Sequence, residues 1–457
     1  MSFDVITQLI DQGIARYGGQ PGFFACQSNW GIDSEPKCYM MLEPVAQAIG
    51  FLDRSEIVSA DAAPIESFET CFGALDKLSS FDHGGVPYAS CFLNYELLHA
   101  IENVPNRQVS NETQLYCGFI YRRVVEISSD GAMHERRISF ADFPEPFWKM
   151  GQCETVQGGQ RPPADSPTDS TVQTRSSFTK QEYLSSVNRI RSLSRKGEVY
   201  QVNLTQMFSG IFPETFVNLH AAAATVWRDL VNSTLPSYGA FACLAPNRFI
   251  LSASPELFLR AHAGNLFSSP IKGTCKRGPD PDTDICLSQT LLASEKNLAE
   301  LAMIVDLIRN DMSRVALLGS VEVLAYPRLE TLPYVHHLVG DVCSSLKPGV
   351  RLVEILNALF PCGSITGAPK VAAMRYLNEL EPSRRGIYTG AIGIIAGQRE
   401  FQFNVAIRTL EISSHGYAFG AGGGIVFDSD AEDEYEESLA KASPIRKALY
   451  GVSAKGE

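Results

Sequence analysis

A glutamate and a lysine flank a turn signal in residues 250–274, ILSASPELFLRAHAGNLFSSPIKGT. The glutamate is Glu256, the lysine is Lys272, and strand-like runs rich in Leu, Phe and Ile separate them from Ala263-Gly264-Asn265. Positions that pair across an antiparallel hairpin sum to a constant. A turn centred on Gly264-Asn265 therefore predicts that Glu256 and Lys272 are cross-strand neighbours, close enough to act together in catalysis. An ordinary surface ion pair is the simpler interpretation of these two residues alone.

A helix predicted over 431–449 carries Glu434, Glu437 and Lys441 on one face, because they are spaced by three and four residues. Carboxylates one turn apart can coordinate Mg²⁺, which takes one or two carboxylates together with water and substrate oxygens. Glu300, on a long helix predicted over 288–318, is a further oxygen donor. The competing interpretation is a solvated acidic helix face.

Two glycine-containing segments could bring backbone amides to an anion. FPCGSITGAPK, 360–370, fails the phosphate-loop pattern, although a helix beginning near Pro369 would offer free amides. GAGGGIVFDS, 420–429, overlaps the end of a strand predicted over 417–427 and precedes a helix, so its N–H groups could approach a carboxylate closely. Arg408, predicted on the strand AIRTL, would be the bidentate partner of such a carboxylate. Each glycine run alone is also compatible with a tight turn.

The elements that must position these residues form an α+β pattern. Strand-like runs in meanders with helices between them predict large antiparallel β-sheets, sandwich-like, with helices packed outside, rather than a parallel doubly wound sheet. The chain divides into an N-terminal region, a linker or mobile loop rich in Gly, Pro, Ser and Thr, and a catalytic region, with boundaries at 1–150, 151–177 and 178–457.

Composition narrows the function classes. The chain has 457 residues, 45% of them hydrophobic, and a formal net charge of -12. That charge opposes non-specific binding to nucleic acid or an anionic membrane, and no apolar stretch reaches membrane-spanning length. The eleven cysteines are scattered without a CxxC pair, which argues against a disulfide framework and favours a reducing compartment. We expect a cytoplasmic enzyme with no nucleic-acid or membrane partner.

The motif run SASPE, PIKGT, DLIRND, GSITGAPK, GAGGGIVFDS and EYEES closely resembles the chorismate-utilising enzymes related to the large subunit of anthranilate synthase. The resemblance covers roughly 180–450 and is weaker over 1–150. It implies the α+β fold of anthranilate synthase component I. Within the family, PIKGT with Lys272 is typical of the aminodeoxychorismate synthase group, whereas anthranilate synthases read PIAGT-like there.

The resemblance implies amination of chorismate at C4 to 4-amino-4-deoxychorismate, in para-aminobenzoate and folate biosynthesis. Ammonia would come from a separate glutaminase subunit, since no glutaminase nucleophile motif is found in this sequence. Anthranilate, 2-amino-4-deoxychorismate and isochorismate or salicylate chemistry are the alternatives within the family. A catalytically inactive chorismate-binding subunit would be expected to lack an essential carboxylate, and none of the four is missing.

The resemblance also implies residue roles. Glu256 would be the general acid on the C4 hydroxyl, and Lys272, as a neutral amine, would attack C2. Mg²⁺ would be the cofactor. Its implied ligands are Glu300, Glu434 and Glu437. The implied binding residues for the enolpyruvyl carboxylate are Arg408, Tyr388, Lys441 and the amides of Gly422, Gly423 and Gly424. The residues implied to lie near the ring are Thr366 and His337.

Overall fold

The computed structural model describes residues 3–33, 36–59, 64–102, 104–105, 108–140, 174–212 and 218–453. The helices are α1 (Phe3–Tyr17), α2 (Gly73–Ser79), α3 (Leu98–Ile101), α4 (Lys180–Arg195), α5 (Leu219–Thr234), α6 (Pro281–Leu292), α7 (Glu295–Ser313), α8 (Leu352–Leu359), α9 (Lys370–Leu380) and α10 (Ala431–Ser453). Short 3₁₀ turns occupy Tyr95–Leu97 and Gly363–Ile365.

The N-terminal strands are β1 (Phe24–Ser28), β2 (Lys37–Gly50), β3 (Ser55–Val58), β4 (Pro64–Phe68), β5 (Ala89–Leu93), β6 (Tyr116–Ser128) and β7 (Met133–Arg137). The later strands are β8 (Arg175–Ser176), β9 (Gln201–Gly210), β10 (Tyr238–Ala245), β11 (Arg248–Ser254), β12 (Leu257–His262), β13 (Asn265–Ser269), β14 (Ile271–Lys276), β15 (Glu322–Thr331), β16 (Val335–Ser345), β17 (Gly367–Ala368), β18 (Ala391–Gly397), β19 (Glu400–Val405), β20 (Thr409–Ser413) and β21 (Gly416–Ile425).

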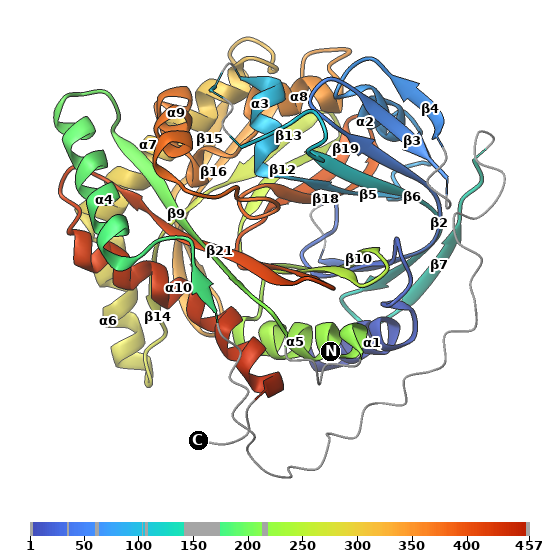
Figure 1. Ribbon diagram of the computed structural model, residues 1–457, viewed down its shortest axis with the longest axis horizontal. Helices are drawn as coiled ribbons and strands as arrows, with labels where there is room; N and C mark the ends of the chain where they lie inside the picture. The colour runs from blue at the N-terminus through green and yellow to red at the C-terminus, as the bar shows by residue number, and fades with distance from the viewer. Residues whose placement is uncertain are drawn as a thin grey trace.

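The strands form one continuous antiparallel network, and the helices lie around it (Figure 1). Strands from the two ends of the chain interleave, because β1 pairs with β10 and β5 pairs with β18. Side chains can therefore be buried on both faces of the network, with helices covering the outside. The predicted α+β class with antiparallel sheets is confirmed.

The core explains why the outer helices form. Helices α1, α5 and α10 bury apolar stripes against the same strands, with Ile10 and Ile14 on α1, Trp227 on α5 and Ile445 on α10 in one cluster. These helices lie side by side along one edge in Figure 1. Spacings of three and four residues keep each stripe on one face, which is the periodicity expected of an amphipathic helix.

The chain is divided differently from the prediction between residues 281 and 313. The predicted long helix over 288–318 is wrong, because the chain forms α6 and α7 with a break before Ser294. The Ser294 hydroxyl accepts the backbone N–H of Asn297 and caps a new helix. The predicted linker 151–177 lies outside the described residues up to 173. No helix in the described ranges is long and apolar enough to cross a membrane.

Candidate active site

Lys272 lies on β14, in the sheet layer formed with β16. Its Nζ donates to the carbonyl oxygen of Ser364 at 3.3 Å. Burial lowers the pKa of the Lys272 amine, and the Lys441 ammonium acts in the same direction, whereas Glu300, Glu256 and Glu437 act against it. The net direction favours the neutral amine, the form that can act as a nucleophile.

Glu256 lies between β11 and β12 and is 4% exposed. Its backbone is held on both sides, since its N–H donates to Ser254 Oγ at 3.2 Å and its carbonyl accepts the Val405 N–H at 3.0 Å. Burial raises the pKa of the carboxyl to about 7, although the Ser364 hydroxyl and the Lys272 ammonium oppose the shift. Oε1 has no hydrogen-bond partner in the described structure. A carboxyl that is protonated near neutral pH suits a general acid.

The predicted hairpin register is wrong. The turn is centred on Ala263 and Gly264, which have φ of 49° and 80°, so that His262 pairs with Asn265. A register shift then occurs before Leu257 pairs with Ser269, and Lys272 lies beyond this ladder on β14. Glu256 and Lys272 are therefore not cross-strand partners. They still lie close enough for each to influence the other's pKa.

Helix α10 presents the two predicted metal-binding carboxylates. Glu434 is buried because it continues the stripe that includes Ser438 and Ala442, at a spacing of four residues. Its Oε1 accepts the Ser429 hydroxyl at 2.6 Å, and burial together with the Glu437 charge raises its pKa. Glu437 is half-exposed and pairs with Lys441 at 2.6 Å.

A glycine leaves room beside these carboxylates. A Cβ on Gly423 would lie 3.1 Å from Glu434 Oε2 and 3.4 Å from Glu437 Oε1. Across the described residues, no three His, Cys, Asp or Glu side chains form a ready-made metal site. Mg²⁺ commonly takes only one or two carboxylates and completes its shell with substrate and water oxygens, so this all-oxygen pair fits such an ion. Glu300, on α7, is the third acid, and its charge acts to raise the pKa of Lys272.

The segment around Arg408 differs from its prediction. Arg408 is not on a strand but in the connection between β19 and β20, with φ of 50°. Burial lowers its pKa, and no acid within the described ranges forms an ion pair with its guanidinium. A partly buried guanidinium without a protein counter-charge is suited to a carboxylate ligand.

His337, on β16, faces the same region as Arg408. Its Nδ1 shares a hydrogen bond with Thr274 Oγ1 at 2.7 Å, and Nε2 has no partner among the described side chains. Burial, followed by the Arg408 and His336 charges, lowers the pKa of His337 to about 4. The ring is therefore neutral at physiological pH, and its Nε2 is buried without a hydrogen-bond partner in the described structure.

The second glycine segment lies at the end of a strand, as predicted, and only its last residues connect β21 to α10. Gly422, Gly423 and Gly424 lie on β21 opposite Thr205, Leu204 and Asn203 of β9. A Cβ on Gly424 would lie 2.5 Å from Gln201 Nε2 and 3.4 Å from Lys272 Nζ, which places this strand against the lysine. The glycines thus supply close approach rather than a turn.

The remaining predicted residues line the same strand pair. Lys441 Nζ donates to the Gly422 carbonyl at 3.2 Å. The ring of Tyr388 occupies the space where a Gly420 side chain would be, and burial raises its pKa to about 12. Thr366 is fully buried after the Gly363–Ile365 turn, and its hydroxyl donates to the Cys362 carbonyl at 3.0 Å.

The structure thus brings the predicted residues to one region, where β9, β14, β21, α7 and α10 meet. Sequence inspection missed Ser364, whose carbonyl and hydroxyl face Lys272 and Glu256, and Gln201, whose side-chain nitrogen and oxygen are buried without partners. Gln201 is the first residue of β9, and its side-chain nitrogen lies where a Gly424 side chain would be, a contact that sequence spacing does not reveal.

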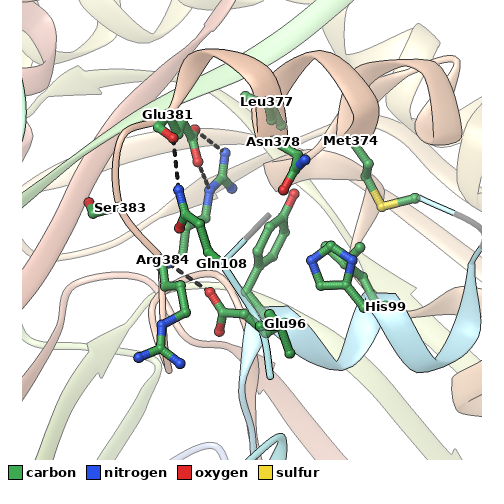
Figure 2. Close-up of a pocket in the computed structure, with 13 residues that line it drawn as sticks. Glu96, His99, Gln108, Met374, Leu377, Asn378, Glu381, Ser383 and Arg384 are labelled. Atoms are coloured by element: carbon green, nitrogen blue, oxygen red, sulfur yellow. Dashed lines mark hydrogen bonds and ion pairs between the residues drawn. The ribbon is translucent and has the colours of Figure 1, made fainter. Parts of the chain in front are cut away.

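Figure 2 shows a different cavity of about 30 Å³, lined by Glu96, Glu381 and their neighbours rather than by Lys272.

Comparisons with known proteins agree with this geometry. Residues 33–447 match the family model for chorismate binding enzymes. Anthranilate synthase component 1 of Aquifex aeolicus is 40% identical over 275 residues, which cover 60% of this chain and 54% of the relative. Aminodeoxychorismate synthase component 1 of Klebsiella aerogenes is 36% identical over 317 residues, which cover 69% of this chain and 68% of the relative. The chain therefore matches between about half and two thirds of these relatives' lengths.

A solved structure is also similar. Anthranilate synthase component I from Streptococcus pneumoniae TIGR4 aligns with a TM-score of 0.72 at 26% sequence identity. The alignment covers 90% of this chain and 92% of that chain.

Proposed function

The chain belongs to the family of chorismate-binding enzymes, and from this premise we propose that it aminates chorismate at C4 to give 4-amino-4-deoxychorismate for para-aminobenzoate and folate biosynthesis. The observation that carries the proposal is Lys272, an amine whose pKa is lowered by burial, beside the protonatable carboxyl of Glu256. An alanine at this position, as in the PIAGT-like motif, would leave ammonia itself as the only nucleophile.

The first step forms a bond between Lys272 Nζ and C2 of chorismate. Both ring double bonds shift, from C1=C2 and C5=C6 to C1=C6 and C4=C5, the C4–O bond breaks, and the hydroxyl leaves as water after taking the proton of Glu256. The attacking nitrogen gives up one proton, which the Glu256 carboxylate can accept. Direct displacement would require hydroxide as the leaving group, so proton transfer from Glu256 lowers the barrier.

The second step forms the C4–N bond from ammonia. Both double bonds shift back to C1=C2 and C5=C6, the C2–N bond breaks, and the proton shed by the new ammonium returns Lys272 to its neutral amine. The sum is chorismate plus ammonia giving aminodeoxychorismate plus water. Lys272 thus moves the amination from C2 to C4 by occupying C2 transiently.

The surrounding residues would bind the substrate at its two carboxylates. Mg²⁺, held by Glu300, Glu434 and Glu437, would supply positive charge to the ring carboxylate. The enolpyruvyl carboxylate would be bound by Arg408, Tyr388, Lys441 and the backbone amides of Gly422, Gly423 and Gly424. Thr366 and His337 would border the ring.

We place the reaction in the cytoplasm, with a separate glutaminase chain supplying ammonia. Every cysteine in the described part of the chain is a free thiol, which is compatible with a reducing compartment. The relatives' designation as component 1 supports a second component.

Product identity tests the proposal. Purified protein is incubated with chorismate, Mg²⁺ and ammonium, and aminodeoxychorismate lyase is then added. We expect para-aminobenzoate. Anthranilate synthase activity is the second candidate, because two of the similar proteins carry that name, and anthranilate as the product would refute amination at C4.

The covalent step has its own test. Chorismate and Mg²⁺ are added without ammonia, the reaction is quenched, and the tryptic peptide that contains Lys272 is analysed by mass spectrometry. A mass increase on Lys272 is expected. Its repeated absence would reduce Lys272 to a positioning or proton-transferring group.

A further inference from the structure

Arg385 follows α9 and forms a buried ion pair with Glu381, at the end of that helix. Arg385 is 2% exposed and Glu381 is 8% exposed. Nε donates to Glu381 Oε2 at 2.8 Å, and Nη2 donates to Oε1 at 2.7 Å, which is a bidentate contact. Figure 2 shows Glu381 near the end of α9, with dashed lines running from it to neighbouring side chains. The ring of Tyr95 lies 4.4 Å below the guanidinium carbon.

The other donors of Arg385 reach three segments of the candidate active site. Nη1 donates to the Ile365 carbonyl at 3.1 Å and to Thr389 Oγ1 at 3.2 Å, and Nη2 donates to the Asn203 carbonyl at 2.7 Å. Ile365 directly precedes Thr366, and Thr389 directly follows Tyr388. One side chain is thus bonded beside two residues expected to contact the substrate, Thr366 at its ring and Tyr388 at its enolpyruvyl carboxylate.

The same pair also fixes the strand opposite the glycines. Asn203, which accepts from Arg385, pairs with Gly424. Glu381 Oε1 accepts the N–H of Thr205 at 2.9 Å, and Thr205 pairs with Gly422. Arg385 and Glu381 therefore hold β9 at the two positions that lie across from the expected carboxylate site.

The N-terminal half of the chain holds Arg385 in turn. Glu96 Oε1 accepts the backbone N–H of Arg385 at 2.8 Å and that of Gly386 at 3.2 Å. Figure 2 shows Glu96 on the element that faces the end of α9. The guanidinium is thereby constrained from its main chain as well as from its acceptors.

We propose that Arg385 is a positioning residue for the chorismate reaction, which sets Thr366, Tyr388 and the β9–β21 pair relative to one another. The inference rests on the proposed function. Its physical basis is that a planar fork with five donors can satisfy a carboxylate and three further acceptors at once, whereas a lysine ammonium has three donors from a single point.

Two substitutions at this position and one control test the inference. Arg385→Met removes every donor, and Arg385→Lys keeps the charge, so at least one folded variant should be obtained. Arg351→Met is the control, because Arg351 forms an ion pair with Asp76 at 2.7 Å between α8 and α2, remote from β9 and β21 in Figure 1. Folded fraction and Tm are measured for each variant, and kcat and KM for chorismate are referred to the folded fraction.

We expect kcat of Arg385→Met to fall by about 100-fold, since displacements of about 1 Å in a reacting geometry cost that much. Arg385→Lys should recover part of the loss, and Arg351→Met should keep the wild-type kcat whatever its Tm. The inference is overturned if kcat of both Arg385 variants stays within about twofold of wild type, or if Arg351→Met loses as much.

The two proposals fail in different ways. A wild-type protein that does not consume chorismate contradicts the proposed function. A wild-type protein that is active, together with equally active folded Arg385 variants, contradicts only the positioning role.

Discussion

In the proposed reaction the position of amination depends on Lys272, and its removal gives the most direct prediction. Lys272→Ala should lower kcat for para-aminobenzoate formation by about 1,000-fold, the scale seen when a group that takes part in the chemistry is deleted. Lys276→Ala is the matched control, because Lys276 is an exposed lysine on the same strand. The coupled assay with ammonium and lyase measures both variants. A Lys272→Ala protein that retains the wild-type rate would exclude the covalent mechanism.

Replacing the Glu256 carboxyl is expected to raise the stability of the fold and to lower its activity. Its pKa is raised from 4.5 to about 7 in the folded chain, so the folded state holds the proton more tightly than the unfolded state. The stability associated with that proton is complete below pH 4.5 and is lost as pH rises through about 7. Glu256→Gln cannot ionise and should be more stable than wild type at pH 8 by about 3 kcal/mol.

Urea unfolding at several pH values checks this expectation. The difference between Glu256→Gln and wild type should shrink towards pH 4.5, while the variant should have lost most of its activity at every pH. Glu436→Gln, an exposed change on α10, should show no comparable dependence on pH. A pH-independent difference at Glu256 would mean that its carboxyl is not held in the protonated form.

At the scale of the element, adding a side chain to a glycine of strand β21 is expected to displace its neighbours. Gly424→Ala would place a Cβ 2.5 Å from Gln201 Nε2 and 3.4 Å from Lys272 Nζ. The flexible Gln201 side chain can move, so the fold should survive, but the lysine and its surroundings should shift and kcat/KM for chorismate should fall by about tenfold or more.

Gly397→Ala is the control for that change. Gly397 ends β18, and a Cβ there would lie 3.7 Å from the Phe81 carbonyl oxygen, an ordinary contact. Both variants should give the circular dichroism spectrum of the wild type, and only Gly424→Ala should lose activity. Equal activity in the two would show that the glycine strand does not border the substrate.

The elements also show what could be predicted from the sequence. The face of α10 that carries Glu434 and Glu437 followed from helical periodicity, which is a local property. The break at Arg408 and the register shift near Leu257 did not follow, because a left-handed residue and a bulge inside a sheet are fixed by neighbouring strands. Glycines at 422–424 indicate close approach equally well in a loop or a strand. In the structure these glycines pair with β9 and therefore lie in a strand.

Whole-molecule arrangement accounts for the residues that sequence inspection missed. Arg385 draws its partners from positions as distant as Glu96 and Asn203, and no spacing along the chain predicts such a cluster. The family motifs did predict which residues meet, since Lys272, Glu300 and Glu437 come from three separate elements yet act on one another. The antiparallel network brings them together, because strands from both ends of the chain pair within it.

For the whole molecule, we expect the chain to depend on an external source of ammonia. The proposed reaction consumes ammonia, and none of the residues assigned to it can hydrolyse glutamine. The purified chain should therefore make para-aminobenzoate precursor from chorismate with ammonium but not with glutamine. Because ammonia and not ammonium is the nucleophile, the rate at fixed total ammonium should rise with pH until Glu256 loses its proton near its pKa of about 7.

Product formation is measured with each nitrogen source across pH 6 to pH 9, and Lys272→Ala serves as the blank for uncatalysed amination. Adding a glutaminase component from an aminodeoxychorismate synthase should make glutamine a substrate if that component binds this chain. Turnover of glutamine by the purified chain alone would contradict the assignment of a separate ammonia source. It would place a second active site on this molecule, apart from the region where β9, β14, β21, α7 and α10 meet.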